Sequence, residues 1–475
     1  MPFCKQYWRP WATLALAVAT GGALCSAQAK PSENKADKAA QPARKGKSEA
    51  AAGQLRKTAA KEPRKPAPAK ARAASSPGAA QQNQAEERLL KVIDLVRQQK
   101  LDAALQAAAS LTSDVPHFQA AQLVYADLLR YKTGHAGAVP AAPVPQAVPI
   151  LVKHAPVAAA AAAAPAGTAN AAAPIDSLQQ LHGLQDEIKR RVQGASALPA
   201  TGSVPAEFLA LAPTVRQAIA IDASKSRLYL FKHEGGKLVL SADYYVSVGK
   251  LGMGKLEEGD QRTPEGMYFI GRQIAGAKLP DFYGKGALTV NYPNDWDRAV
   301  GRSGSGIWLH GSPPDQFARL PQASDGCMVL SNADLTRLMR SVDKLAPVLV
   351  RDRLQWVASA DAGQVRERDA FLQLLTRWQQ SWSQGDNAAL GRLYAPELRG
   401  ADDNKAMQER MAAAFKSANT ALQEVSVYAW KDAQGEIRIA NFRLKSRDLA
   451  EPWSLRQYWR KTGNEWKLFS EDVQG

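Results

Sequence analysis

The sequence has few cysteines, few histidines and no long apolar run. Three cysteines and six histidines occur in 475 residues, and no Cys-x-x-Cys, His-Glu-x-x-His or clustered Cys/His pattern is present. The usual spacings of zinc ligands are therefore missing, which argues against a metal site. The longest apolar run covers residues 11–24, whereas a membrane-spanning helix needs about 20 residues. An integral membrane protein is thus disfavoured, and a membrane contact is expected only through the N-terminal segment.

Negative charge is also scarce, with 45 acidic against 61 basic residues and a formal net charge of +16. The excess is local, because 13 basic and 4 acidic residues lie between Lys30 and Ala85. This segment is rich in Ala, Lys, Pro, Gln and Ser without apolar periodicity, which is typical of a solvated basic tether. The rest of the chain is only mildly basic, so we expect no nucleic-acid partner.

The first thirty residues have the three parts of a secretory signal peptide. Two basic residues precede the apolar run, and Ala27-Gln28-Ala29 supplies the small residues of a cleavage site. Cleavage would remove Cys4 and Cys25 and leave Cys327 as the single cysteine of an exported protein. Such a thiol cannot form an internal disulfide, so it is either inert and buried or reactive.

The remaining pattern predicts a multidomain protein. Helical periodicity between residues 86 and 135 loosely resembles one tetratricopeptide unit, which can hardly bury its own apolar face. Alternating apolar residues with dense Gly and Pro predict a mostly-β domain, and helices followed by alternating strands predict an α+β domain. The predicted segments are a signal peptide (1–29), a basic disordered tether (30–85), a helical segment (86–135), an Ala/Pro linker (136–174), a short helical lead-in (175–213), the mostly-β domain (214–352) and the α+β domain (365–475).

Cys327 stands in a pattern that fits nucleophilic catalysis. It ends the sequence Ser324-Asp325-Gly326-Cys327, and His310 lies 17 residues earlier at the end of a predicted strand, before Gly311. An imidazole can take the proton of a thiol or pair with the thiolate. The backbone amides of Gly326 and Cys327 can hold an oxyanion. These features together favour a catalytic cysteine over a structural one, and we expect its thiol pKa to be lowered.

These residues resemble the signature of the YkuD-type L,D-transpeptidases, which is an HG pair followed after a gap by [ST]-x-G-C. The stretch Gly259–Tyr268 is similar to the family's T-P-x-G-x-[YF] motif, and Asn291–Asn294 with Arg302–Gly311 looks like the subgroup found in diderm bacteria. The resemblance covers about residues 215–352. Residues 365–475 are similar, more loosely, to a SnoaL or nuclear-transport-factor-like cone.

The resemblance implies a periplasmic cysteine acyltransferase that uses no cofactor and acts on peptidoglycan tetrapeptide stems. Cys327 would attack the carbonyl of the third stem residue, a diamino acid, and D-alanine would leave. His310 would act as general base and then acid, while the backbone near Gly326 holds the oxyanion. An amine would then resolve the thioester, giving a 3–3 cross-link or a link to a wall protein.

Two positions depart from the family pattern. Asp325 stands where many members have His, and Val329 stands where they have Arg or Asn. The missing side chain at Val329 matters if it steadies the site or binds a substrate carboxylate, and we expect Arg302 or Arg298 to substitute for it. Other candidates carry less weight, namely Gly311 and Tyr268 for substrate binding, and Asp325 (through its backbone), Ser324 and Thr263 for the shape of the site.

Two alternatives stay open. In a hydrolase of the same fold, water would resolve the thioester and trim stems. A non-catalytic wall-binding scaffold would instead use the helical and C-terminal segments to contact other envelope proteins. Aromatic residues of the C-terminal segment are predicted mainly to pack in its core, although some would line a hydrophobic mouth; these are Trp378, Trp382, Trp453 and Trp459.

Overall fold

The computed structural model describes residues 84–134, 177–359, 361–398, 402–415, 420–447 and 449–474. The predicted signal peptide, nearly all of the basic tether and the linker 136–174 lie outside these ranges. Within them, no helix combines the length and the apolar character needed to cross a membrane.

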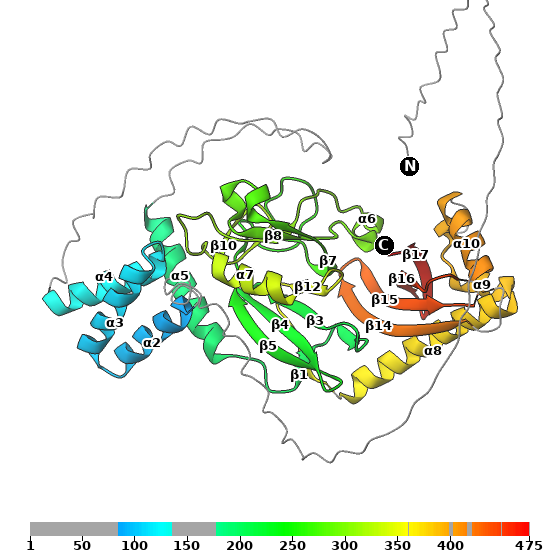
Figure 1. The fold of residues 1–475 in the computed structure, drawn as a ribbon, viewed down its shortest axis with the longest axis horizontal. Helices are drawn as coiled ribbons and strands as arrows, with labels where there is room; N and C mark the ends of the chain where they lie inside the picture. The colour runs from blue at the N-terminus through cyan, green and yellow to red at the C-terminus, as the bar shows by residue number, and fades with distance from the viewer. Residues whose placement is uncertain are drawn as a thin grey trace, which may run out of the picture. The chain divides into compact units, whose positions relative to one another are not determined.

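Four helices form the N-terminal part of the described chain (Figure 1). They are α2 (Ala85–Arg97), α3 (Leu101–Asp114), α4 (Gln119–Thr133) and α5 (Ser177–Ser196). Leu89, Leu111 and Phe118 are almost fully buried, and the cluster that they form also contacts Leu184 of α5 and Phe317 of the β domain. The first three helices therefore bury one apolar face against other parts of the chain, as a single helical unit must.

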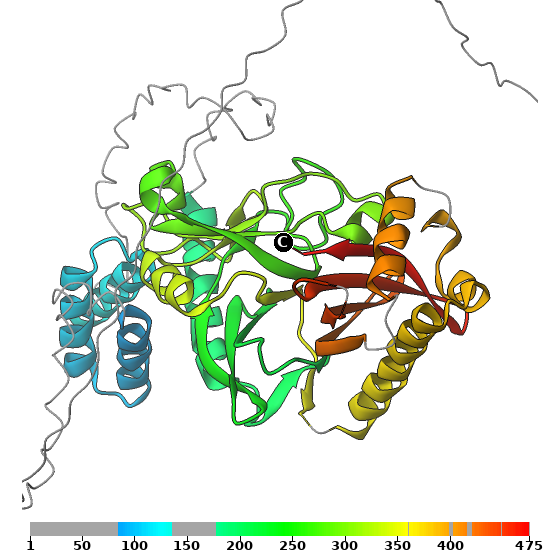
Figure 2. The same ribbon diagram turned by 45° about the vertical axis from the view of Figure 1, so that its right-hand side comes forward.

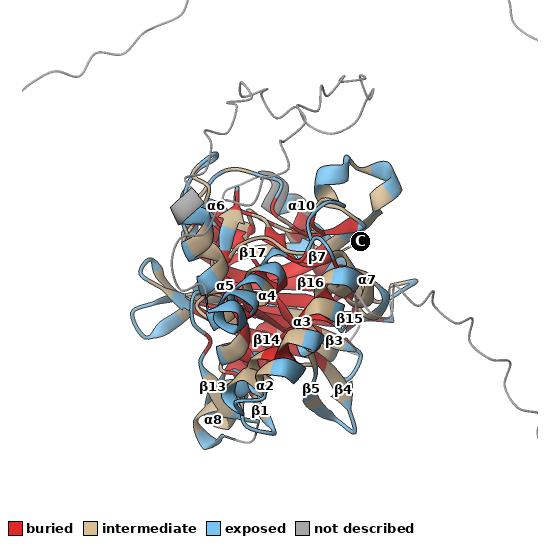
Figure 3. Cartoon of the chain, turned by 90° about the vertical axis from the view of Figure 1, so that its left-hand side faces the viewer, coloured by how far each residue is buried: buried red, intermediate tan, exposed pale blue. Residues whose placement is uncertain are grey.

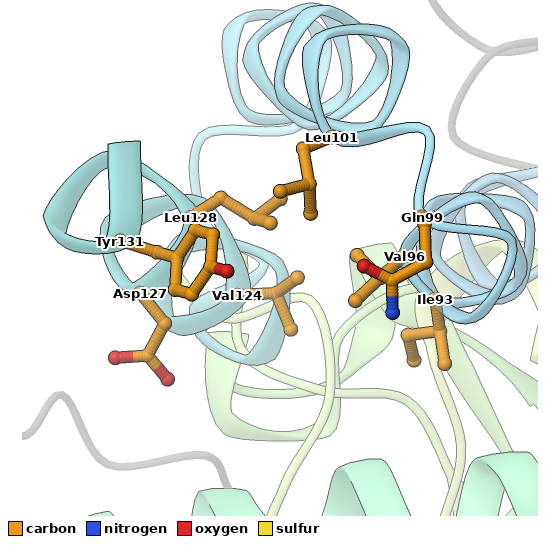
Figure 4. A pocket seen from close by; sticks show the side chains of 8 residues that line it. All are labelled: Ile93, Val96, Gln99, Leu101, Val124, Asp127, Leu128 and Tyr131. Atoms are coloured by element: carbon orange, nitrogen blue, oxygen red, sulfur yellow. The ribbon is translucent and has the colours of Figure 1, made fainter. Parts of the chain in front are cut away.

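This helical unit also carries an apolar groove of about 360 Å³, lined by residues of α2, α3 and α4 (Figure 4). Ile93 and Val96 come from α2, Leu101 begins α3, and Leu128 and Tyr131 come from α4. The side chain of Tyr131 is 72 % exposed. The groove is thus open to solvent.

An eight-stranded sheet dominates the middle of the chain. Its strands, in spatial order, are β11 (Met328–Val329), β9 (Trp308–His310), β8 (Gly286–Val290), β7 (Gly266–Ala275), β12 (Pro347–Arg351), β3 (Gln217–Asp222), β4 (Arg227–Glu234) and β5 (Lys237–Tyr245). Most neighbours are antiparallel, but β11 and β9 run parallel, as do β12 and β3. Apolar residues of these strands pack with Leu335 and Leu338 of α7 (Asn332–Ser341) in one core. Ser331 caps that helix by accepting a hydrogen bond from the Asp334 amide at 3.1 Å.

A second, antiparallel sheet forms the C-terminal domain, shown in orange to red in Figure 2. Its consecutive strands are β14 (Ala421–Asp432), β15 (Gly435–Lys445), β16 (Trp453–Thr462) and β17 (Glu465–Val473), and its helices are α8 (Ala362–Gln384), α9 (Asn387–Leu393) and α10 (Asp402–Ala414). Trp378 and Trp459 are fully buried in its core. Trp382 is partly exposed and lines, with Tyr394, a pocket of about 280 Å³. The prediction that most of the tryptophans pack in the core is confirmed for Trp378 and Trp459.

The segment between α5 and the β domain differs from the prediction. Residues 175–213 were expected to be a short helical lead-in. The helix is present as α5, but the strands β1 (Ser203–Pro205) and β2 (Phe208–Ala210) that follow it were not expected. β1 pairs with β13 (Trp356–Ala358), and β2 pairs with β14 as the fifth strand of the C-terminal sheet. A strand of three residues carries no readable periodicity, and the partners of β1 and β2 lie more than 150 positions away.

The two β domains share one apolar core. The Phe208 ring lies 6.4 Å from Phe231 of β4 and 6.2 Å from Tyr428 of β14. The Tyr428 ring in turn lies 5.5 Å from Phe269 of β7. Figure 3 shows buried residues along the strands of both sheets and exposed residues on the outer faces of the helices. The C-terminal domain is therefore packed directly against the middle domain.

Candidate active site

His310 and Cys327 come from neighbouring parallel strands. His310 ends β9, Cys327 directly precedes β11, and the register pairs Met328 with Leu309 and Val329 with His310. Residues in register on parallel strands face the same way, and alternate residues of a strand share a face. His310 and Cys327 are therefore placed on one face of the sheet edge.

Tyr283 borders His310 and lies within range of the charge of a Cys327 thiolate. It belongs to a 3-10 turn, Asp281–Tyr283, and its ring centroid lies 5.0 Å from that of His310 and 5.1 Å from that of Trp308. Burial raises the pKa of the Tyr283 hydroxyl, and the charge of a Cys327 thiolate would raise it further. The imidazole, the thiol and this phenol thus occupy one small region.

The imidazole of His310 is buried and held in one tautomer. Its Nδ1 lies 2.7 Å from the carbonyl oxygen of Gly311. A carbonyl only accepts, so Nδ1 carries the proton and Nε2 carries the lone pair of the neutral ring. Burial lowers the pKa of His310 to about 4, and the charge of Arg319 acts in the same direction. At neutral pH the ring is therefore neutral and able to accept a proton at Nε2.

The thiol of Cys327 is also neutral at rest. Burial raises its pKa, and the charge of Asp325 raises it further, while the charge of Arg319 lowers it. The sulfur donates a 3.4 Å hydrogen bond to the Gly306 carbonyl. The expectation of a lowered thiol pKa is therefore wrong, because motif residues do not reveal how far the turn is buried. A thiol that keeps its proton needs a base to take that proton before its sulfur can act as a thiolate nucleophile.

The turn before Cys327 requires glycine at position 326. Gly326 has φ +124°, and a Cβ at this position would lie 2.8 Å from the Arg262 carbonyl oxygen. The Thr263 hydroxyl donates to the Gly326 carbonyl at 2.9 Å, and the Ser324 hydroxyl donates to the Cys327 carbonyl at 2.6 Å. Ser324 and Thr263 thus fix the turn that carries the sulfur.

The expected oxyanion donors are only partly available. The Gly326 amide donates to Ser324 Oγ at 3.2 Å, so it is already partnered and does not fit the expected role. For the Cys327 amide, the described part of the chain offers no acceptor. The carboxylate of Asp325 is exposed and pairs with Lys250 at 2.8 Å. Asp325 therefore acts on the thiol only through its charge. The Cys327 amide is the remaining candidate donor to an oxyanion.

Arg302 and Arg298 do not replace the missing side chain of Val329. Arg302 donates to Asp297 at 2.9 Å and to Asp432 of the C-terminal domain at 2.7 Å, so both ends of its guanidinium are occupied. Arg298 is held by Asp295 and by the Pro293 carbonyl. The expectation that Arg302 binds substrate is therefore corrected, since a partner 130 positions along the chain engages it.

Tyr268 and Gly311 also lack a surface for substrate. Tyr268 is fully buried, and its hydroxyl donates to the Glu265 carbonyl at 3.1 Å. Gly311 is buried as well, its amide donates to the Tyr283 carbonyl at 3.1 Å, and a Cβ there would collide with Asn332. Both residues shape the site, and Gly311 does so by fixing the His310 ring through its carbonyl.

Three residues near the site were missed by sequence reasoning: Phe282, Tyr283 and Arg319. The Phe282 side chain is 45 % exposed, and its ring lies 5.7 Å from His310. The Arg319 guanidinium lies 4.4 Å from the centroid of the Phe282 ring. No motif marks these residues, although Arg319 is the single basic residue between His310 and Cys327.

The comparisons with known proteins agree with the motif. Residues 216–350 match YkuD, the L,D-transpeptidase catalytic domain. This family consists of cell-envelope enzymes whose substrates are peptidoglycan stem peptides. No curated protein sequence matches the chain.

Solved structures resemble larger parts of the chain. Bd1075 of Bdellovibrio bacteriovorus is 25 % identical with a TM-score of 0.47, over 57 % of this chain and 98 % of its own. Pgp2 of Campylobacter jejuni, described as a helical cell shape determining protein, is 20 % identical with a TM-score of 0.43, over 54 % and 91 %. An L,D-transpeptidase from Mycobacterium smegmatis is 14 % identical with a TM-score of 0.20, over 29 % and 58 %.

Proposed function

We propose that this chain is a cysteine acyltransferase that remodels peptidoglycan through a thioester on tetrapeptide stems. The observation that carries the proposal is the placement of Cys327 and His310 on one face of adjacent strands, with the His310 Nδ1 proton held by Gly311. The match of residues 216–350 to the L,D-transpeptidase catalytic domain supplies the substrate class.

In the first half-reaction, Nε2 of His310 takes the thiol proton as the sulfur attacks the carbonyl carbon of the third stem residue. A carbon–sulfur bond forms, and the carbonyl oxygen becomes an oxyanion that the Cys327 amide binds. The intermediate collapses with cleavage of the carbon–nitrogen bond. His310 gives its proton to the departing nitrogen, and D-alanine leaves.

In the second half-reaction, an acceptor amine attacks the thioester carbon. His310 takes a proton from this amine, a new carbon–nitrogen bond forms, and the carbon–sulfur bond breaks. The sulfur regains its proton from His310, which restores the neutral pair. Because both groups are neutral at rest, each half-reaction begins and ends in the same protonation state.

Product analysis tests this proposal. The purified chain is incubated with disaccharide-tetrapeptide, beside a Cys327→Ala control, and the products are weighed by mass spectrometry. A dimer that depends on Cys327, together with free D-alanine, is the expected result. Tripeptide without dimer would replace the transferase by a hydrolase, and no change in either sample would favour a scaffold.

The proposal extends to location and partners. The N-terminal signal pattern and the envelope family support a periplasmic protein of a diderm bacterium. We propose that the C-terminal domain is of the SnoaL or nuclear-transport-factor-like class, which is supported by its three α-helices followed by an antiparallel sheet. Its pocket at Trp382 and the groove on the helical unit are the surfaces through which other envelope proteins would bind.

A further inference from the structure

The chain between His310 and Cys327 brings a cation to the site. We define the Arg319 loop as residues 313–321. The guanidinium of Arg319 stacks on Phe282 at 4.4 Å, and Phe282 in turn contacts the His310 ring at 5.7 Å. An aromatic face attracts a guanidinium and fixes its plane. The charge is thus held one ring away from the general base.

Arg319 is a charged group without a matching anion. Its Nη1 donates a 3.5 Å hydrogen bond to the Ala323 carbonyl, and its Nε is buried with no acceptor in the described part of the chain. Asp325, whose charge acts on Arg319, is engaged by Lys250 instead. Nε is closed to solvent, whereas Nη2 has no hydrogen-bond partner in the described part of the chain. Nη2 is therefore the donor that is left for an anion, which would also supply the missing charge partner.

The backbone of the Arg319 loop is fixed from the N-terminal side. The Tyr245 hydroxyl donates to the Arg319 carbonyl at 3.0 Å, and the Phe317 amide donates to the His117 carbonyl at 3.2 Å. The Phe317 ring packs on Phe118 at 4.2 Å. Tyr245 is itself covered by the guanidinium of Arg191 at 3.8 Å. The helical unit therefore holds the loop that presents Arg319.

We propose that Arg319 binds the terminal carboxylate of the donor stem and so supplies the cation that Val329 cannot. This inference rests on the proposed function. The leaving D-alanine carries a carboxylate two bonds from the scissile nitrogen. This carboxylate is therefore the substrate anion that a cation near the nucleophile would bind. Arginine binds carboxylates through two parallel hydrogen bonds. Arg319 is thus a specificity residue that selects donors with a free C-terminus.

The first test needs no peptidoglycan. Alkylation rates of Cys327 are measured with iodoacetate and with iodoacetamide at low ionic strength, and their ratio is divided by that of free cysteine. A carboxylate site beside the sulfur raises this normalised ratio by about 10-fold in the native chain. Arg319→Gln should return it to near 1, and Arg319→Lys should keep part of it. An unchanged ratio in Arg319→Gln would overturn the inference.

Arg298→Gln is the matched control, because it removes one positive charge from the same domain at a guanidinium that Asp295 already holds. Its alkylation ratio should equal that of the native chain. An equal loss in both variants would show that net charge, rather than a site at Arg319, sets the ratio.

The second test uses donor stems that end in a free carboxylate or in an amide. Arg319→Gln should lower kcat/KM for the acid by about 10- to 100-fold and for the amide by less than about 3-fold. Equal losses for both donors would reduce Arg319 to support of the fold or of the thiolate. If the native chain turns over neither donor, the proposed function fails, and the alkylation test still decides the role of Arg319.

Discussion

Two arginines of the middle domain show how differently one residue type is used. Arg302 is engaged by two carboxylates, Asp297 at 2.9 Å and Asp432 at 2.7 Å. Arg319 has an aromatic ring and one long backbone hydrogen bond. The first arginine joins two domains, whereas the second stacks on Phe282, whose ring lies 5.7 Å from that of His310. The partners of an arginine, more than its position relative to a motif, indicate what it does.

The surroundings of the two arginines extend this contrast. Asp432 also accepts hydrogen bonds from the indoles of Trp296 and Trp430, both at 3.1 Å, so the domain junction is closed by mutual contacts. Around Cys327 the groups are a neutral thiol, a neutral imidazole and a cation without an anion. A region with satisfied charges contributes stability, and a region with unsatisfied ones is prepared for a ligand.

The largest effect is expected at the site. His310→Gln removes the proposed general base but keeps a side chain of similar length, so kcat/KM should fall by about 10²- to 10⁴-fold. Steady-state kinetics with disaccharide-tetrapeptide measures this, with circular dichroism as the check on folding. A loss smaller than 10-fold, on the order of a side-chain repacking effect, would remove His310 from the chemistry.

At the domain junction, a matching charge removal should affect stability instead. Arg302→Met leaves the buried carboxylate of Asp297 without its ion-pair partner, so the free energy of unfolding should fall by about 2–4 kcal/mol. This loss is somewhat smaller than for a fully buried pair, because Arg302 is partly exposed. The KM of the variant should stay within about 3-fold of the native value, because Arg302 is held by Asp297 and Asp432 rather than left for substrate. A 3-fold change corresponds to less than about 1 kcal/mol. Urea unfolding and kinetics are compared for one preparation. A raised KM at native stability would restore Arg302 as a substrate-binding residue.

Acid should separate the native chain from His310→Gln. Burial lowers the pKa of His310 from 6.5 to about 4, so between these values the unfolded state binds a proton that the folded state does not. Stability therefore falls as the pH drops through this window. We expect the native chain to lose about 1–3 kcal/mol more than His310→Gln between pH 7 and pH 4. Equal losses in urea unfolding would contradict the neutral, buried imidazole.

The nucleophile turn should tolerate no side chain at position 326. Gly326→Ala places a Cβ against the Arg262 carbonyl at a positive φ, with an expected cost of about 1–3 kcal/mol. Gly301→Ala is a matched control, because Gly301 also has a positive φ (79°) but has open space around the Cβ. The rate at which iodoacetamide labels Cys327 should differ from the native rate in Gly326→Ala and equal the native rate in Gly301→Ala.

Part of this molecule could be predicted from its sequence. The helices of the N-terminal unit follow from apolar spacing, and His310 and Cys327 follow from a motif whose glycines serve the backbone directly. In contrast, β2 has three residues and pairs with a strand more than 200 positions later. The partner of Arg302 is similarly remote, and the raised pKa of the Cys327 thiol depends on burial by several segments. Local patterns do not contain such long-range contacts.

The proposed function requires that Cys327 forms a thioester with the donor stem. The most direct measurement is the intact mass of the chain after rapid acid quenching of a reaction with disaccharide-tetrapeptide. The native chain should carry an adduct with the mass of the acyl group that remains after loss of D-alanine, and Cys327→Ala should carry none. Release of D-alanine by Cys327→Ala at the native rate, or a native chain that shows neither adduct nor release, would contradict it.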